Sequence, residues 1–157
     1  MTLSTNYYNR SIDLSIFQGI KSSGAVTVEQ SLFNSGGEVC TGIQKLIQRW
    51  LIAFLTPKGT MKYHPEWGTD FLVNVGSLTN EVDAEIEFYM CNSDACDQLK
   101  SEDENDGTVK EDEQLESVKL NGIVVSSTGF SLNIKLTSLA GESAPLILPI
   151  TVNPLQL

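Results

Sequence analysis

The chain has 157 residues, of which 41% are hydrophobic, and its 20 acidic and 10 basic residues give a formal net charge of −10. This length and composition suffice for the core of one domain. The acidity opposes binding to phosphate backbones and anionic lipid headgroups, and the sequence has neither a secretory signal nor an apolar run of membrane-spanning length. We therefore expect a soluble protein without a nucleic-acid or membrane partner.

The N-terminal part is predicted to be an extension followed by two strands. Residues 1–10 are polar and form the extension. Residues 11–17 alternate apolar and polar side chains, as a half-buried strand does, and residues 25–33 contain a second, weaker alternation. Turn residues at 19–24 and 34–37 separate these strands from the next element.

The strongest pattern in the chain is an amphipathic helix that begins after Thr41, a plausible N-cap. Its apolar residues recur at helical spacing and define one face: Ile43, Leu46, Ile47, Trp50, Leu51, Phe54 and Leu55. Lys45 and Arg49 lie on the polar face, where they are either solvated or meet an acidic neighbour in an assembly. Trp50 is either a core residue or an interface anchor. Pro57 and Gly59 end the helix.

A second helix is predicted at about residues 81–100, capped by Thr79 or Asn80. Its expected buried stripe is Val82, Ile86 and either Tyr89 or Met90, and the helix is expected to be weak near Asn92. Residues 101–116 are rich in carboxylates and poor in apolar anchors. Such a segment favours a loose, solvated loop, with an acidic docking segment as the alternative.

The C-terminal part is predicted to be β-structure. Residues 118–126 and 130–137 form a hairpin around a short polar turn, and residues 146–152 form a last strand. Pro149 cannot donate a backbone hydrogen bond, so this last strand lies at an edge or contains a bulge. We expect an α+β fold, in which two helices pack on a small, mainly antiparallel sheet made from the N-terminal strand and the C-terminal hairpin.

The order of these elements resembles the baseplate wedge family of contractile tails known as lysozyme-like or sheath-initiator proteins, which occurs in bacteriophages and in bacterial type VI secretion machines. Residues 42–71 carry the resemblance: an amphipathic helix, a Leu-Thr…Gly turn at residues 55–59, and a Pro-x-aromatic-Gly element made by Pro65, Glu66, Trp67 and Gly68. Members often have an acidic-x-Arg element after the second helix. Its nearest counterpart is residues 113–115, Glu113-Gln114-Leu115, which contain no arginine.

The resemblance implies a structural, non-enzymatic subunit of the virion, made in the host cytoplasm and located in the tail baseplate. It would join the wedge to the hub and tube, contact other wedge proteins, and be present in six copies per baseplate. Its C-terminal sheet would start sheath assembly by accepting a strand of the sheath protein, because an exposed strand edge presents unpaired backbone groups. The candidate strand residues are Leu146, Ile147, Leu148, Ile150 and Val152.

The wedge-contact candidates are Lys45, Arg49, Trp50, Pro65, Glu66, Trp67 and Gly68. The alternative function is a tail-associated lysozyme that cleaves peptidoglycan, with Glu66 and Asp70 as its carboxylate pair. Against this alternative, residues 64–70 also suit a turn set by Pro65 and Gly68. The single histidine, His64, and the scattered Cys40, Cys91 and Cys96 do not have the spacing of a zinc site or of a disulfide framework. We expect no cofactor and no metal.

Overall fold

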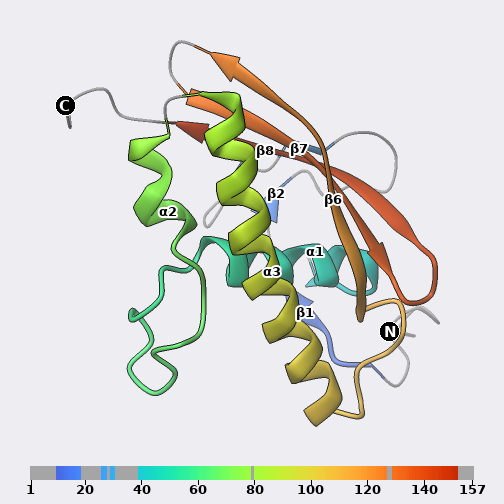
Figure 1. Ribbon diagram of the computed structural model, residues 1–157. Helices are drawn as coiled ribbons and strands as arrows, with labels where there is room; N and C mark the ends of the chain where they lie inside the picture. The colour runs from blue at the N-terminus through green and yellow to red at the C-terminus, as the bar shows by residue number, and fades with distance from the viewer. Residues whose placement is uncertain are drawn as a thin grey trace.

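The computed structural model describes residues 10–18, 26–27, 29–30, 39–78, 80–126 and 129–151. Within these ranges the chain is an α+β fold in which helices pack on a twisted sheet (Figure 1). The long helices are α1 (Ile43–Leu55) and α3 (Glu81–Asn105). A short α2 (Phe71–Asn74) continues into the 3-10 turn η2 (Val75–Ser77) between them.

The main sheet has the strand order β3-β8-β7-β6. The predicted hairpin is β6 (Leu115–Ser126) and β7 (Gly129–Ser138), and the predicted last strand is β8 (Ser143–Thr151), antiparallel to β7. Residue 152 lies outside the described residues. The short β3 (Val26–Thr27) pairs with β8 in parallel over two residue pairs. The sheet is therefore mainly antiparallel, as expected.

The predicted place of the N-terminal strand is wrong. Residues 11–17 contain β1 (Asp13–Leu14) and the start of β2 (Phe17–Gln18), which pair with β5 (Val39–Cys40) and β4 (Glu29–Gln30) instead of the hairpin. Gln48 of α1 explains this position: its amide nitrogen donates to the Leu14 carbonyl and its amide oxygen accepts from the Ile16 N–H, both at 2.9 Å. The predicted extension at 1–9 and turns at 19–24 and 34–37 lie outside the described residues.

The core lies between α1, α3 and one face of the sheet. Trp50 and Phe54 of α1 stack with ring centroids 4.7 Å apart, and Phe54 also contacts Phe71 and Phe88. Along β7 the buried and the partly exposed residues alternate, so a single face of the sheet meets the helices. The predicted apolar face of α1 is confirmed, and Trp50 is a fully buried core residue.

The predicted buried stripe of α3 is wrong. Its buried residues are Ala84, Phe88, Cys91, Asn92, Ala95 and Leu99. Val82 and Ile86 are 62% and 55% exposed. The expected weakness near Asn92 is also absent, because its side-chain oxygen accepts a hydrogen bond from the Trp50 indole at 3.1 Å and the helix continues to Asn105. Asn80 caps the helix by accepting from the Asp83 N–H.

This assignment of faces predicts unequal effects of two truncations in α3. Phe88→Ala removes a fully buried ring and is expected to lower the free energy of unfolding by about 3–5 kcal/mol. Ile86→Ala removes an exposed side chain and is expected to change it by less than about 0.5 kcal/mol. Denaturant unfolding of both variants measures the difference, and a larger loss for Ile86→Ala would contradict the observed packing.

Candidate functional site

A buried carboxylate joins the start of α1 to the segment before β6. Glu113 is 1% exposed, and one of its oxygens accepts from the Lys45 ammonium at 2.9 Å. Its other oxygen accepts from the backbone N–H of Gly42 at 3.1 Å, and Gly42, rather than the predicted Thr41, is the N-cap of α1. Lys45 also donates to the carbonyl of Ser11 at 3.3 Å. Three distant parts of the chain therefore meet at Glu113.

Arg49, one turn further along α1, binds the same acidic segment. Its guanidinium donates to Asp103 at 2.7 Å, to Glu102 at 3.4 Å and to the carbonyl of Glu113 at 3.1 Å. Arg10 adds an ion pair with Asp112 at 2.9 Å. The predicted loose loop at 101–116 is therefore wrong: residues 101–105 are the last part of α3, and the turns that follow are held by cations of α1 and of residue 10.

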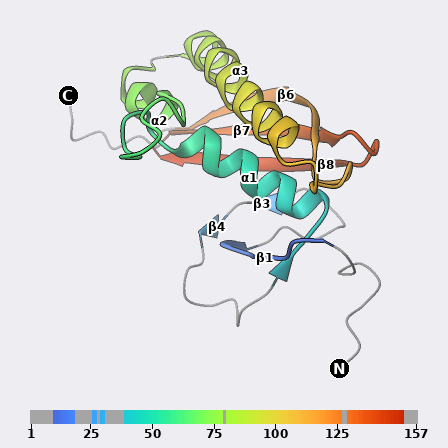
Figure 2. The same cartoon turned by 90° about the horizontal axis from the view of Figure 1, so that it is seen from below.

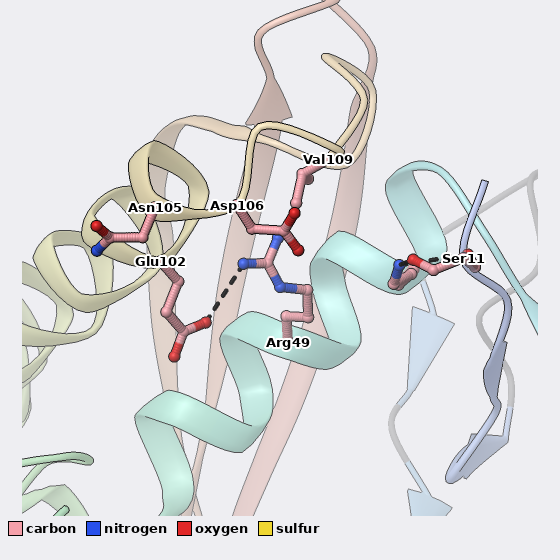
Figure 3. Close-up of a pocket in the computed structure, with 7 residues that line it drawn as sticks. Ser11, Arg49, Glu102, Asn105, Asp106 and Val109 are labelled. Carbon is pink, nitrogen blue, oxygen red and sulfur yellow. Dashed lines mark hydrogen bonds and ion pairs between the residues drawn. The ribbon is translucent and has the colours of Figure 1, made fainter. Parts of the chain in front are cut away.

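Lys45 and Arg49 also line an open cleft of about 470 Å³ between α1 and the C-terminal end of α3 (Figure 3). It is lined by Ser11, Lys45, Arg49, Glu102, Asn105, Asp106 and Val109. Hydrogen bonds from Thr108 hold the pKa of the Asp106 carboxyl below its usual value. Both cations of the cleft already have carboxylate partners, so the cleft has no unpaired positive charge with which to bind an anion. The arrangement serves to position segments.

The loop after α1 is tied to α3 through Gly68. The Gln98 side chain accepts from the Gly68 N–H and donates to the Gly68 carbonyl, both at 2.9 Å. Gly68 has φ +101°, and an added Cβ would lie 2.1 Å from the carbonyl oxygen of Thr56. Trp67 is half-buried against the core, and its indole donates to Glu102 at 2.8 Å. Gly68 and Trp67 thus anchor the loop.

The same loop presents its tip to solvent. Tyr63 is 82% exposed and Met61 is 42% exposed. Pro65 and Glu66 are also exposed, and the Pro65 carbonyl accepts from the Gly59 N–H at 2.8 Å across the loop. Of the predicted wedge contacts in this loop, Pro65 and Glu66 are therefore available to a partner.

The carboxylate pair suggested for a lysozyme has no catalytic surroundings. Glu66 and Asp70 are both exposed, and neither lines the cleft beside Lys45 and Arg49. A glycosidase acid needs apolar surroundings that keep it protonated at neutral pH. The geometry of this loop thus gives no support to the pair.

The three cysteines are free thiols of low reactivity. Burial raises the pKa of Cys40 to about 11, that of Cys91 to about 12 and that of Cys96 to about 11. A raised pKa leaves little thiolate, the reactive form, at neutral pH. Among the described residues no group of three His, Cys, Asp or Glu side chains is placed to hold a metal ion.

The register of the sheet shows which backbone groups point away from it. An added Cβ on Gly129 would lie 2.0 Å from the carbonyl oxygen of Ile150, so this oxygen points from β8 towards β7. Backbone direction alternates along a strand, so Phe130, which pairs with Ile150, turns its backbone groups towards β8. On the other side of β7, Val125 of β6 pairs with Phe130. Because the backbone groups of Phe130 point away from β6, the N–H and C=O of Val125 point to the outer side of β6.

The same alternation places Pro145 and Pro149 on the outer side of β8. These prolines leave the ladder with β7 intact but remove two donors from the outer edge. Between them, β3 pairs with Leu146 and Ile147. The side chains of Leu146, Leu148 and Ile150 are buried in the core, whereas Ile147 is partly exposed. The predicted sheath-contact strand thus has few backbone donors to offer.

Sequence reasoning missed Glu113 as the partner of Lys45, and it missed the outer edge of β6. No local pattern pairs Lys45 with Glu113, because 68 positions separate them. The edge of β6 had a visible signal, since residues 122–126 contain neither a charge nor a proline.

Comparison with known proteins does not identify a relative: no family model, no curated protein and no solved structure matches the chain. Within the described part of the chain, none of the helices has the length and apolar character needed to cross a membrane.

The buried ion pair predicts a large effect of removing one partner. Glu113→Ala leaves the Lys45 ammonium without its carboxylate in a buried position, and we expect a loss of about 3 kcal/mol in the free energy of unfolding. Glu111→Ala, at an exposed carboxylate in the same segment, is the matched control with a loss below about 0.5 kcal/mol. The double variant Lys45→Met/Glu113→Leu should recover most of the loss, and equal losses for both single variants would contradict the role of Glu113.

The loop anchor predicts that two glycines with positive φ differ in tolerance. Gly68→Ala meets the Thr56 carbonyl, whereas Gly59→Ala, at φ +81°, has nothing within 4 Å of the new Cβ. We expect Gly68→Ala to cost at least about 1 kcal/mol more in unfolding free energy than Gly59→Ala. Thermal or denaturant unfolding gives the comparison, and equal costs would mean that the loop adjusts without this contact.

Proposed function

We propose that this chain is a structural baseplate wedge subunit of a contractile phage tail, which joins the wedge to the hub and tube and starts sheath assembly by accepting a strand on its C-terminal sheet. Two observations support the proposal. The helix, turn and Pro-x-aromatic-Gly loop that carry the resemblance to the sheath-initiator family are joined in one anchored unit, and none of the described strands pairs with the outer side of β6 in the C-terminal sheet.

The open edge is the observation that carries the proposal. β6 is twelve residues long, and no described strand pairs with its outer side. Val124 and Val125 at its end are 58% and 59% exposed. β6 carries Glu116 and Lys119 near its start, but residues 122–126 contain neither a charge nor a proline. An uncharged strand edge of this kind is a template for another strand, and proteins normally protect it unless a partner covers it.

Within the C-terminal sheet, the outer side of β6 suits an added strand better than the outer side of β8. A strand added to β8 would meet β3 at Leu146 and Ile147 and would lack the donors that Pro145 and Pro149 cannot supply. A strand added to β6 would meet a continuous backbone from Gly122 to Ser126. We therefore assign the sheath contact to β6, with β8 as the strand that supports the hairpin from the other side.

The exposed tip of the loop is the proposed contact with the neighbouring wedge proteins. Tyr63, Pro65 and Glu66 protrude from a loop whose base is held by the hydrogen bonds between Gly68 and Gln98. A tyrosine on a rigid support is well suited to interface contacts, because little conformational entropy is lost when it binds. Lys45, Arg49 and Trp50 act inside the subunit in this proposal, since their polar or apolar contacts are already made.

Strand addition predicts that a backbone donor of β6 matters more than its side chain. Val125→Pro removes an outward N–H without removing a bond to β7, whereas Val125→Thr keeps the N–H and the β-branched shape. In assembly with a tail sheath protein of the same phage, we expect Val125→Thr to start sheath polymerisation like the wild type and Val125→Pro to reduce it at least about tenfold. Electron microscopy of the assembled sheaths gives the count.

As a control, thermal unfolding of both variants shows whether each of them is folded. If folded Val125→Pro starts sheaths as well as Val125→Thr does, strand addition at β6 is wrong. If the chain is absent from purified tails analysed by mass spectrometry, the baseplate function itself is wrong.

A further inference from the structure

The outward face of α3 carries an apolar stripe that no described element covers. Val82, Ile86, Tyr89 and Met90 are 62%, 55%, 49% and 64% exposed. Their spacing of i, i+4, i+7 and i+8 places them on one side of the helix over about two turns. The side chains that follow on this face, such as Ser93 and Asp97, are polar, so the stripe is confined to the N-terminal half of α3.

This half of α3 is apolar on two opposite sides. Ala84, Phe88 and Cys91 pack into the core from the inner side, so the outer stripe is not needed to hold the helix on the sheet. A helix with apolar side chains on two opposite sides can be covered from both of them. The outer stripe therefore indicates a binding surface.

The charges beside the stripe indicate the chemistry of what binds there. Glu81, Asp83, Glu85 and Glu87 alternate with the apolar positions, and the first basic residue along α3 is Lys100. A partner with lysines and arginines around an apolar strip would meet these carboxylates favourably. In a dimer through this face, the carboxylates of the two copies would repel each other. The net charge of −10 on each copy adds to this repulsion, so self-association through this face is opposed.

The neighbourhood of the stripe suits a helix. α2 packs beside the N-terminal half of α3, where Asn74 donates to Glu87 at 2.8 Å (Figure 1). α2 carries two more exposed apolar residues, Leu72 at 41% and Val73 at 65%. Helical ridges of another chain pack well on a straight row of side chains at this spacing.

We propose that the outward face of α3 binds a basic amphipathic helix of another protein, whose apolar side covers Val82, Ile86, Tyr89 and Met90. This surface is separate from the edge of β6 and from the loop tip, and the binding is independent of the proposed baseplate function. The binding energy comes from burial of the stripe, while the carboxylates select a partner of opposite charge.

The test uses a synthetic helical peptide of 18 residues, with leucines at i, i+4, i+7 and i+11 and with lysines and arginines beside them. In a second peptide, glutamate replaces every basic residue. Isothermal titration of the full chain should show binding of the basic peptide and none of the acidic one. The double variant Ile86→Ala/Met90→Ala keeps every charge, and we expect it to bind the basic peptide at least about tenfold more weakly.

The matched control is Leu14→Ala/Leu139→Ala, which removes two side chains that are 62% and 53% exposed outside the stripe and should bind like the wild type. Equal binding of the basic peptide to both double variants would overturn the proposal, because the attraction would then be charge alone. Equal binding of the acidic peptide would also overturn it. The proposal would likewise be overturned if sedimentation showed that the wild type is a dimer and that Ile86→Ala/Met90→Ala is a monomer. The stripe would then bind a second copy of this chain.

Discussion

The buried carboxylate of Glu113 is the constraint on which the arrangement of the elements depends. It accepts hydrogen bonds from the Gly42 N–H and the Lys45 ammonium, both at the start of α1, where the unpaired N–H groups and the helix dipole favour a negative charge. Because Glu113 lies just before β6, this contact sets the position of the hairpin relative to α1. Arg49 donates both to the carbonyl of Glu113 and to Asp103 near the C-terminal end of α3, so the two long helices and the segment before β6 share one polar junction.

The buried face of an element could be predicted from the sequence where the element has one clear apolar face. It could not be predicted for α3, which has two. α1 and β7 each have a single apolar side, so their periodicity predicts both the element and its buried face. The sequence predicts the buried stripe of α3 on a side that is exposed, because Val82, Ile86 and Met90 have the same helical spacing as a core stripe. Phe88 and Leu99, which do face the core, do not fall on that stripe.

The polar junction was beyond sequence reasoning for a different physical reason. An acid-rich segment stays loose when its charges have no partners and its apolar residues have no core to join. Residues 101–116 have partners, but the partners are Arg10, Lys45 and Arg49, which belong to other parts of the chain. Leu115 at the end of the segment is buried in the core as well. The composition of a segment gives the number of its carboxylates. It does not show which cations from distant parts of the sequence lie beside them in the fold.

The two sides of the sheet differ in a way that favours one direction of approach for partners. On the β8 side, Pro145, Pro149 and β3 occupy or remove the outward backbone groups, and the strands β1 and β4 lie beyond them (Figure 2). On the opposite side lie β6 and α3, which pack on each other. Here the outer backbone of β6 and the apolar stripe of α3 both remain uncovered by the described residues. A strand pairs through backbone groups and a helix packs through side chains, so the two surfaces suit partners of different kinds.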